Sequence, residues 1–273
     1  IDTGQPLTGR YQSASATGGE GTGMDLKLSG RTALVTGASM GIGRAIARAL
    51  AAEGVRLAVV ARRGELLEAL GTEIVAQGSV QPAAIVQDIM ARDAAVALRD
   101  RALAALGRVE IVVNCAGGSR PLPLDGPEEA WEEALTLNFT RQRQLTHALL
   151  PQMIAHGWGR IINITGKSEP DRLNAAFAAK AAMHAWAKGL SREVGRHGIT
   201  VNSIPPGRIM SEQIRRNYPE AERERFAAAE IPVGRYGEPE ELASLAVFLA
   251  SPLAGYITGA VIPVDGGLRR YSF

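Results

Sequence analysis

The sequence has few of the residues that mark secreted, membrane-spanning or metal-binding proteins. It contains a single cysteine, Cys115, so no intrachain disulfide can form, and we expect a reducing, cytoplasmic location. No apolar run approaches the roughly 18 residues that a membrane-spanning helix needs. The four histidines show no spacing with acids or cysteine that suits a metal ion, which argues against a zinc site.

An excess of charge of one sign is also missing. The 30 Lys and Arg residues nearly balance the 28 Asp and Glu residues, which leaves a net charge of +2. So small an excess gives no basic patch for nucleic acid. By contrast, 46% of the 273 residues are apolar, which is enough for a sizeable core. The composition favours a globular protein.

The first 23 residues differ from the rest of the chain. They are rich in glycine, serine and threonine and contain almost no large apolar side chains. They also lack the apolar stretch of a secretory signal. We expect residues 1–23 to be a flexible leader or tag remnant, with Met24 as a native start, and residues 24–273 to form one domain.

From residue 31 onward, short apolar runs alternate with amphipathic stretches such as 43–53, 91–106 and 175–196. Most of the apolar runs are continuous, which is typical of strands buried on both faces. This succession predicts a single Rossmann-type doubly wound α/β domain with a parallel sheet of about seven strands. The expected strands are Thr32–Thr36, Arg56–Ala61, Ala83–Gln87, Glu110–Val113, Arg160–Ile164, Thr200–Ile204 and Val261–Val264.

A glycine-rich turn, Thr36-Gly-Ala-Ser-Met-Gly-Ile-Gly43, joins the first expected strand to the first expected helix. Gly37 permits a tight turn, and Gly41 and Gly43 let the backbone approach a pyrophosphate at the positive helix N-terminus. Such a turn can also do no more than join two elements, but its place between strand and helix favours nucleotide binding. The expected cofactor-binding residues in this turn are Gly37, Ser39, Met40, Gly41, Ile42 and Gly43.

The end of the second expected strand indicates which dinucleotide binds. An acid about 20 residues past the glycine turn would bind the ribose 2′-hydroxyl of NAD, but Ala61 occupies that position. Arg62 and Arg63 follow it, and a guanidinium suits a 2′-phosphate. The alternative is a solvated arginine pair at the start of a helix. These residues favour NADPH over NADH.

Further motifs follow in order along the chain. They are Asp88-Ile89, Asn114-Cys-Ala-Gly117, Asn138 in Leu-Asn-Phe-Thr, Pro206-Gly-Arg-Ile209 and Val264-Asp-Gly-Gly267. Together with the glycine turn, they resemble the motifs of the short-chain dehydrogenases/reductases, and in particular the 3-oxoacyl-(acyl-carrier-protein) reductase-like group. The resemblance runs from about Leu28 to Leu268. It implies an NADPH-dependent enzyme that reduces a carbonyl group, of a 3-oxoacyl thioester or a related ketone, to an alcohol.

The same resemblance implies further residues of the cofactor site. It places Asp88 and Ile89 at the adenine, and Pro206, Gly207 and Ile209 at the nicotinamide. The other cofactor residues that it implies are Asn114, Ala116, Gly117, Lys180 and Ser211. It also implies a homotetramer or homodimer that packs through helices around 141–156 and 175–196 and through the C-terminal segment.

The family's catalytic residues are only partly present in this sequence. The family uses Tyr-x-x-x-Lys on a helix, where the lysine ammonium lowers the pKa of the phenol on the same helix face. Lys180 is present, but Ala176 stands in the tyrosine position. Phe177 is adjacent, but it has no hydroxyl and points about 100° away around the helix.

The family's catalytic serine is also missing, because Gly166 takes its expected position. Thr165 and Ser168 carry the nearest hydroxyls. The expected catalytic residues are therefore Asn138, Lys180 and Ser168, with Lys180 donating a proton and Ser168 binding the carbonyl oxygen. Alternatively, Lys180 only binds the nicotinamide ribose. Cys115 is interpreted as a small buried packing residue.

Three functional hypotheses remain open from the sequence. A slow NADPH-dependent carbonyl reductase is compatible with the missing groups, because the proximity of hydride donor and ketone survives their loss. The second hypothesis is a non-catalytic NADP-binding sensor or partner subunit, which the two replacements favour. A lyase or isomerase that uses a reduced set of groups is the third and least favoured.

Overall fold

The computed structural model describes residues 24–119, 121–166 and 173–271. The expected leader, residues 1–23, and the candidate catalytic residue Ser168 lie outside the described residues. The described part forms a parallel six-stranded sheet in the order β3-β2-β1-β4-β5-β6. The strands are β1 (Thr32–Thr36), β2 (Arg56–Ala61), β3 (Ala83–Val86), β4 (Ile111–Asn114), β5 (Gly159–Ile164) and β6 (Ile199–Ile204).

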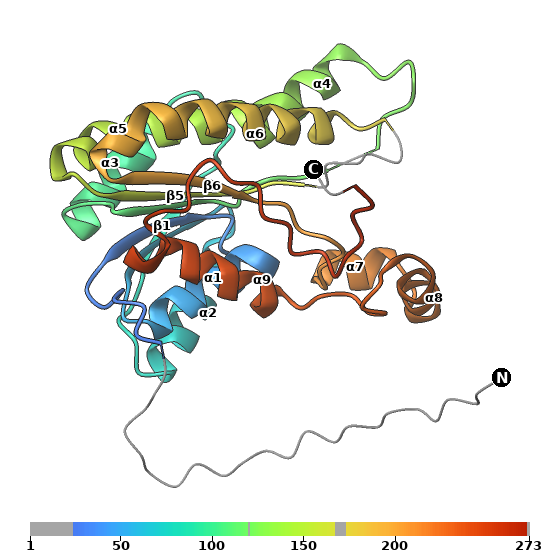
Figure 1. The fold of residues 1–273 in the computed structure, drawn as a ribbon, viewed down its shortest axis with the longest axis horizontal. Coiled ribbons are helices and arrows are strands. Elements are labelled where there is room, and N and C mark those ends of the chain that lie inside the picture. Colours follow the sequence, from blue (N-terminus) through green and yellow to red (C-terminus); the bar gives the residue numbers. More distant parts are fainter. Residues whose placement is uncertain (1–23, 120, 167–172, 272–273) are drawn as a thin grey trace, which may run out of the picture.

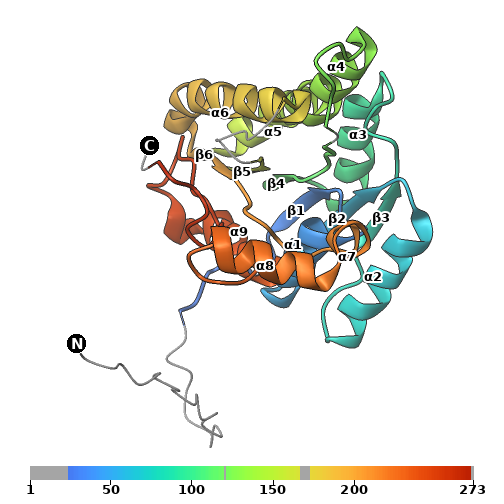
Figure 2. The same cartoon turned by 90° about the vertical axis from the view of Figure 1, so that its right-hand side faces the viewer.

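Helices cover both faces of the sheet (Figures 1 and 2). One face carries α1 (Gly41–Ala52), α2 (Gly64–Ala76) and α9 (Pro239–Ala250). The other face carries α3 (Ala94–Leu106), α5 (Arg141–His156) and α6 (Ala175–Val194). This arrangement confirms the predicted doubly wound α/β fold.

The central strands are largely apolar because both of their faces are buried. In β1, Leu34 packs in the core beneath α3 and α5, whereas its neighbour Val35 packs in the core beneath α1 and α9, and both are fully buried. Alternate residues of a strand point to opposite faces, so each strand contributes to two cores at once. A continuous apolar run is the sequence pattern that this burial requires.

The expected seventh strand, Val261–Val264, is wrong as a regular strand. It follows the end of β6 through isolated bridges, Ser203 with Val261 and Pro206 with Val264. Backbone hydrogen bonds still join Ile262 to Ser203 and Val264 to Pro205, but Pro205 has no N–H to donate in return, which interrupts the ladder at this edge.

The order of the strands places a crevice at the centre of the sheet. Chain order reverses between β1 and β4, so the segments that follow these two strands diverge to opposite faces. Ligands of doubly wound sheets bind in such a crevice, beyond the carboxyl ends of the strands. Three further elements border this end of the sheet: α4 (Glu128–Leu135), α7 (Glu212–Asn217) and α8 (Glu220–Glu230).

No helix among the described residues is both long enough and apolar enough to cross a bilayer.

Candidate active site

A pocket of about 600 Å³ opens at the carboxyl ends of the strands. It brings together segments that are far apart in the sequence: the glycine turn, the ends of β2, β4 and β5, the first turns of α6, and the segment after β6. The expected site residues that line it are Gly37, Ser39, Met40, Ile42, Gly43, Arg62, Arg63, Asp88, Ile89, Ala116, Gly117, Asn138, Lys180, Pro206, Ile209 and Ser211.

The glycine turn follows β1 in a conformation that larger residues would disturb. Gly37 has φ +69°, and a Cβ there would lie 2.9 Å from the backbone N and Cα of Ala116. A Cβ on Gly43 would lie 2.3 Å from the carbonyl oxygen of Gly37. The first turn of α1 therefore packs directly on the turn that leads into it, and both glycines are needed for that contact.

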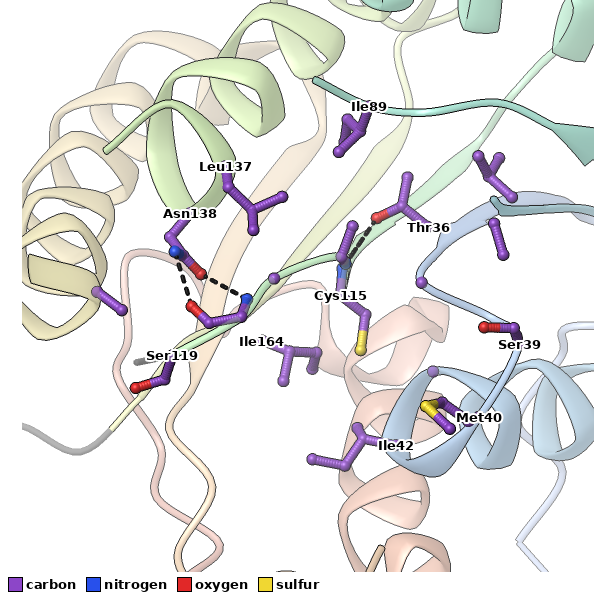
Figure 3. A pocket seen from close by; sticks show the side chains of 18 of the residues that line it. Thr36, Ser39, Met40, Ile42, Ile89, Cys115, Ser119, Leu137, Asn138 and Ile164 are labelled. Carbon is purple, nitrogen blue, oxygen red and sulfur yellow. Dashed lines mark hydrogen bonds between the residues drawn. The ribbon is translucent and has the colours of Figure 1, made fainter. Parts of the chain in front are cut away.

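Thr36 holds the glycine turn against the end of β4. Its hydroxyl accepts hydrogen bonds from the backbone N–H groups of Cys115 (3.0 Å) and Ala116 (3.1 Å), as Figure 3 shows. The same hydroxyl donates to the carbonyl oxygen of Val113 at 3.2 Å. These three bonds fix the distance between the two strand ends that border the crevice.

The arrangement fits an elongated ligand that carries phosphates. No side chain caps the N-terminus of α1, and no acid lies in its first turn, so its free N–H groups and positive dipole face the pocket. Arg62 and Arg63 line the same pocket beyond the end of β2 and are exposed. Arg63 approaches the sulfur of Met40 at 3.4 Å, so this guanidinium lies beside the glycine turn.

Asn138 lies in a π-helical turn, Thr136–Thr140, between α4 and α5. Its side-chain amide donates to the carbonyl oxygen of Gly118 at 2.9 Å, and its oxygen accepts from the N–H of Gly118 at 3.1 Å (Figure 3). The amide also donates to the carbonyl oxygen of Ala134 at 2.9 Å. Helical π-turns occur often at functional sites. Here the turn ties the loop after β4 to the helices above the pocket, so Asn138 shapes the pocket wall.

Lys180 carries the amine at the base of the pocket. Its side chain is buried, with the residue 8% exposed, and Nζ donates to the carbonyl oxygen of Ile164 at 2.8 Å. Burial lowers the pKa of this amine from 10.5 to about 8, and the nearby Cys115 partly offsets that effect. The group can therefore exchange a proton close to neutral pH.

Cys115 lines the pocket as well as packing against the core, which extends its interpretation as a packing residue. Burial raises the pKa of its thiol to about 12, although the positive charge of Lys180 lowers it slightly. The thiol therefore stays protonated at neutral pH and is a poor nucleophile.

The two replaced positions leave room beside Lys180. Ala176 and Gly166 both line the pocket. A Cβ on Gly166 would meet Lys180 Cγ at 3.6 Å, an ordinary van der Waals contact, so the backbone here accepts a larger residue. Phe177, the next residue around the helix, also lines the pocket.

Three expected cofactor residues do not line this pocket. Asn114 is buried behind it, where its side-chain amide donates to Thr146 Oγ1 and Asn163 Oδ1, both at 2.9 Å. Gly207 packs on Asp265, where a Cβ would lie 2.5 Å from the Asp265 Cα. Gly41 instead lines a smaller hollow of about 200 Å³ under α7.

Sequence reasoning assigned no role to several of the residues that line the pocket. A few directly flank a motif, as Gln87 and Met90 flank Asp88-Ile89, and this adjacency was a usable signal. Others come from helices whose orientation the sequence did not fix. The missed residues include Thr36, Gln87, Met90, Ser119, Glu133, Leu137 and Thr165. Across the described ranges, no cluster of three or more His, Cys, Asp or Glu side chains could hold a metal ion.

Comparisons with known proteins agree with this geometry. Residues 37–269 match the family model described as enoyl-(acyl carrier protein) reductase. The chain is 38% identical over 248 residues to the 3-oxoacyl-[acyl-carrier-protein] reductase FabG of Pseudomonas aeruginosa. The matched region covers 89% of this chain and 99% of that protein. It is also 34% identical over 247 residues to the galactitol 2-dehydrogenase (L-tagatose-forming) of Cereibacter sphaeroides. That match covers 88% of this chain and 96% of that protein.

Solved structures of reductases and dehydrogenases are also similar to this chain. L-sorbose reductase from Gluconobacter frateurii, complexed with NADPH and L-sorbose, superposes with a TM-score of 0.86 at 29% identity, covering 91% of this chain and all of that one. A 7α-hydroxysteroid dehydrogenase complexed with NADH and a 7-oxo bile acid superposes with a TM-score of 0.84 at 32% identity, covering 89% and 96%.

The packing of the glycine turn predicts opposite effects for two glycine-to-alanine substitutions in helices. Gly43→Ala forces a methyl group onto the carbonyl oxygen of Gly37 and should lower the free energy of unfolding by about 1–3 kcal/mol. Gly189→Ala in α6 meets open space and should raise it by about 0.5–1 kcal/mol. Urea unfolding of both variants measures this. Equal changes in the free energy of unfolding for the two variants would contradict the close packing of Gly43 on the carbonyl oxygen of Gly37.

Proposed function

Because the chain belongs to the short-chain dehydrogenase/reductase family, we propose that it is an NADPH-dependent oxidoreductase that reduces a carbonyl compound to an alcohol. The observation that carries this proposal is one pocket lined by the glycine turn, the Arg62–Arg63 pair and the buried amine of Lys180. The phosphate-binding end and the proton-exchanging end therefore share one elongated cavity.

The residues present would hold the cofactor along this cavity. The glycine turn and the N-terminus of α1 would bind the diphosphate, and Arg62 and Arg63 the 2′-phosphate. Asp88 and Ile89 would contact the adenine, and Pro206 and Ile209 the nicotinamide. When bound, NADPH would supply the hydride. Lys180 would bind the nicotinamide ribose and face the substrate.

Lys180 would also supply the proton. With Ala176 in place of the tyrosine, no phenol at this position takes that role. The Lys180 ammonium, with its pKa lowered to about 8, would donate a proton to the carbonyl oxygen as hydride reaches the carbon. The substrate would be a 3-oxoacyl thioester or a related ketone, in keeping with the reductases and dehydrogenases to which the chain is similar.

A catalytically impaired NADP-binding sensor or partner subunit is the second candidate. Ala176 and Gly166 favour it, because the family's phenol and serine hydroxyl are both missing at the base of the pocket. A positioned general acid contributes about 10²–10⁴ in rate, so its loss makes a slow enzyme or a binding protein.

We also propose a homodimer or homotetramer assembled through α5 and α6. These helices pack side by side over one face of the sheet. Their outer surface carries Trp186, which stacks on His147 with ring centroids 5.8 Å apart and meets Phe139 edge-on at 6.3 Å. Aromatic side chains of this kind are common anchors at protein interfaces.

The arginine pair predicts the preference for NADPH. In a fluorescence titration, the cofactor-free wild type should bind NADPH more tightly than NADH. Arg62→Ala should weaken NADPH binding by about tenfold or more while leaving NADH binding nearly unchanged, because it removes a cation beside the 2′-phosphate. Arg56→Ala, which alters an exposed arginine at the opposite end of β2 and outside the pocket, is the matched control. Equal losses for both cofactors would contradict this assignment.

The pKa of Lys180 predicts the pH dependence of reduction. Only the ammonium can donate, so kcat should fall about tenfold per pH unit once the pH exceeds about 8. Lys180→Met should lower kcat strongly and remove this inflection. Steady-state oxidation of NADPH in the presence of a ketone, followed from pH 6 to 10, measures both effects. Unchanged turnover in Lys180→Met would exclude the assigned role.

Restoring the missing groups distinguishes the two candidate functions. Ala176→Tyr with Gly166→Ser should raise reductase turnover by about 10²-fold or more, because a phenol beside Lys180 resupplies a positioned acid. If the wild type is a slow enzyme, the double variant accelerates an existing activity. If the wild type is a binding protein, turnover appears only in the double variant. A double variant that binds NADPH but gains no rate would contradict the placement of these positions.

A further inference from the structure

A pair of polar side chains, Thr165 in the pocket lining and His184 outside it, takes no part in the mechanism above. Thr165 is the first residue after β5, is buried, and lines the pocket. His184 lies on α6, and its Nε2 is 2.7 Å from the Thr165 hydroxyl oxygen. This is a short hydrogen bond between a hydroxyl and an imidazole, the pairing that moves protons in many active sites.

The pair is adjacent to Lys180 in two directions. Lys180 donates to the carbonyl oxygen of Ile164, and Thr165 is the next residue along that backbone. Lys180 and His184 are also four residues apart on α6, so they lie on the same helix face. Thr165 therefore follows the residue that holds the Lys180 amine, and the imidazole of His184, which is partly exposed, lies one helical turn further along α6.

Lys180 needs such a partner if it donates a proton. In this structure its Nζ contacts a backbone carbonyl oxygen, which accepts hydrogen bonds but has no proton to give. A buried amine that has lost its proton must regain one before the next turnover.

The charges around His184 suit it to the task. Burial lowers the pKa of its imidazole, and the positive charges of Lys180 on the same helix and Arg269 in the C-terminal segment lower it further. The imidazolium form therefore gives up its proton more readily than the Lys180 ammonium, so a proton moves downhill from imidazolium to neutral amine.

We propose that Thr165 and His184 form the proton path that recharges Lys180 during carbonyl reduction. The inference rests on the proposed reductase function. The carbonyl carbon accepts the hydride, and the carbonyl oxygen takes a proton from Lys180, which becomes a neutral amine. Thr165 passes its hydroxyl proton to Lys180 and takes the Nε2 proton of the His184 imidazolium. His184, now neutral, regains a proton from solvent, so each turnover consumes one proton.

A purely structural hydrogen bond that fastens α6 to β5 is the competing explanation. The two explanations differ in what they predict for the pH dependence of the rate. A structural bond affects the free energy of unfolding, whereas a proton path affects kcat and its dependence on pH. In the second case kcat should rise as the pH is lowered through the pKa of His184.

The test compares Thr165→Val, Thr165→Ser and His184→Gln with His197→Gln as the matched control. His197 is a half-buried histidine in the turn Gly195–His197, outside α5 and α6, and does not line the pocket. Thr165→Val and His184→Gln should each lower kcat by at least about tenfold, leave NADPH binding unchanged, and lose the rise in rate at low pH. Thr165→Ser and His197→Gln should keep the wild-type rate and pH profile.

Combining the variants separates a shared path from independent effects. The double variant Thr165→Val/His184→Gln should be no slower than either single variant, because groups that act as one unit are not additive. Added imidazole should restore part of the rate of His184→Ala, a readout that survives if Thr165→Val does not fold. Wild-type kcat and pH profile in Thr165→Val and His184→Gln would overturn the proton path alone. A wild type that binds NADPH but turns over no ketone would overturn the proposed function and the path with it.

Discussion

The hydroxyl of Thr36 is the contact on which the geometry of the pocket depends. It joins the ends of β1 and β4, the two strands at which the order of the sheet reverses, through bonds to Val113, Cys115 and Ala116. Because this contact fixes the spacing of the two strand ends, the glycine turn must pass close to the backbone of Ala116, and only a residue without a side chain fits there. The position of α1, whose N-terminus faces the pocket, follows from that close packing.

At the other end of the pocket lies the buried amine of Lys180. The amine of Lys180 is held by one backbone carbonyl beneath α6, and its burial brings its pKa toward neutrality. In a chain with a tyrosine at position 176, the phenol would share the proton chemistry with this amine. In this chain Ala176 and Gly166 leave the amine to face the pocket, with the Thr165–His184 pair beside it. The glycine-turn end of the pocket thus keeps the family's sequence pattern, and the Lys180 end departs from it.

The sequence predicted those features that depend on local patterns. Continuous apolar runs predicted the parallel sheet because strands such as β1 are buried on both faces, and the glycine turn was recognisable because its spacing is set by backbone contacts within eight residues. The segment Val261–Val264 was predicted as a regular strand because its residues are mostly apolar. It forms only isolated bridges, because Pro205 opposite it has no N–H to continue the ladder.

Features that depend on packing between distant elements could not be predicted in this way. The pairing of Thr165 with His184 requires the register of α6 over β5, and the direction of Phe177 depends on how that helix is rotated. Neither is encoded in a short motif. The position of Asn114 behind the pocket follows from its bonds to Thr146 and Asn163 on two other elements, which the sequence does not show to be neighbours.

The transfer of hydride is the event that separates an enzyme from a binding protein, and it can be observed directly. Wild-type protein would be incubated with NADPH carrying deuterium at the transferable C4 position and with a panel of 3-oxoacyl thioesters and simple ketones, and the products analysed by mass spectrometry. The account predicts an alcohol product that carries one deuterium on the former carbonyl carbon, at a rate that Lys180→Met lowers. Tight binding of NADPH without deuterium in any product would contradict it and assign the chain a binding role.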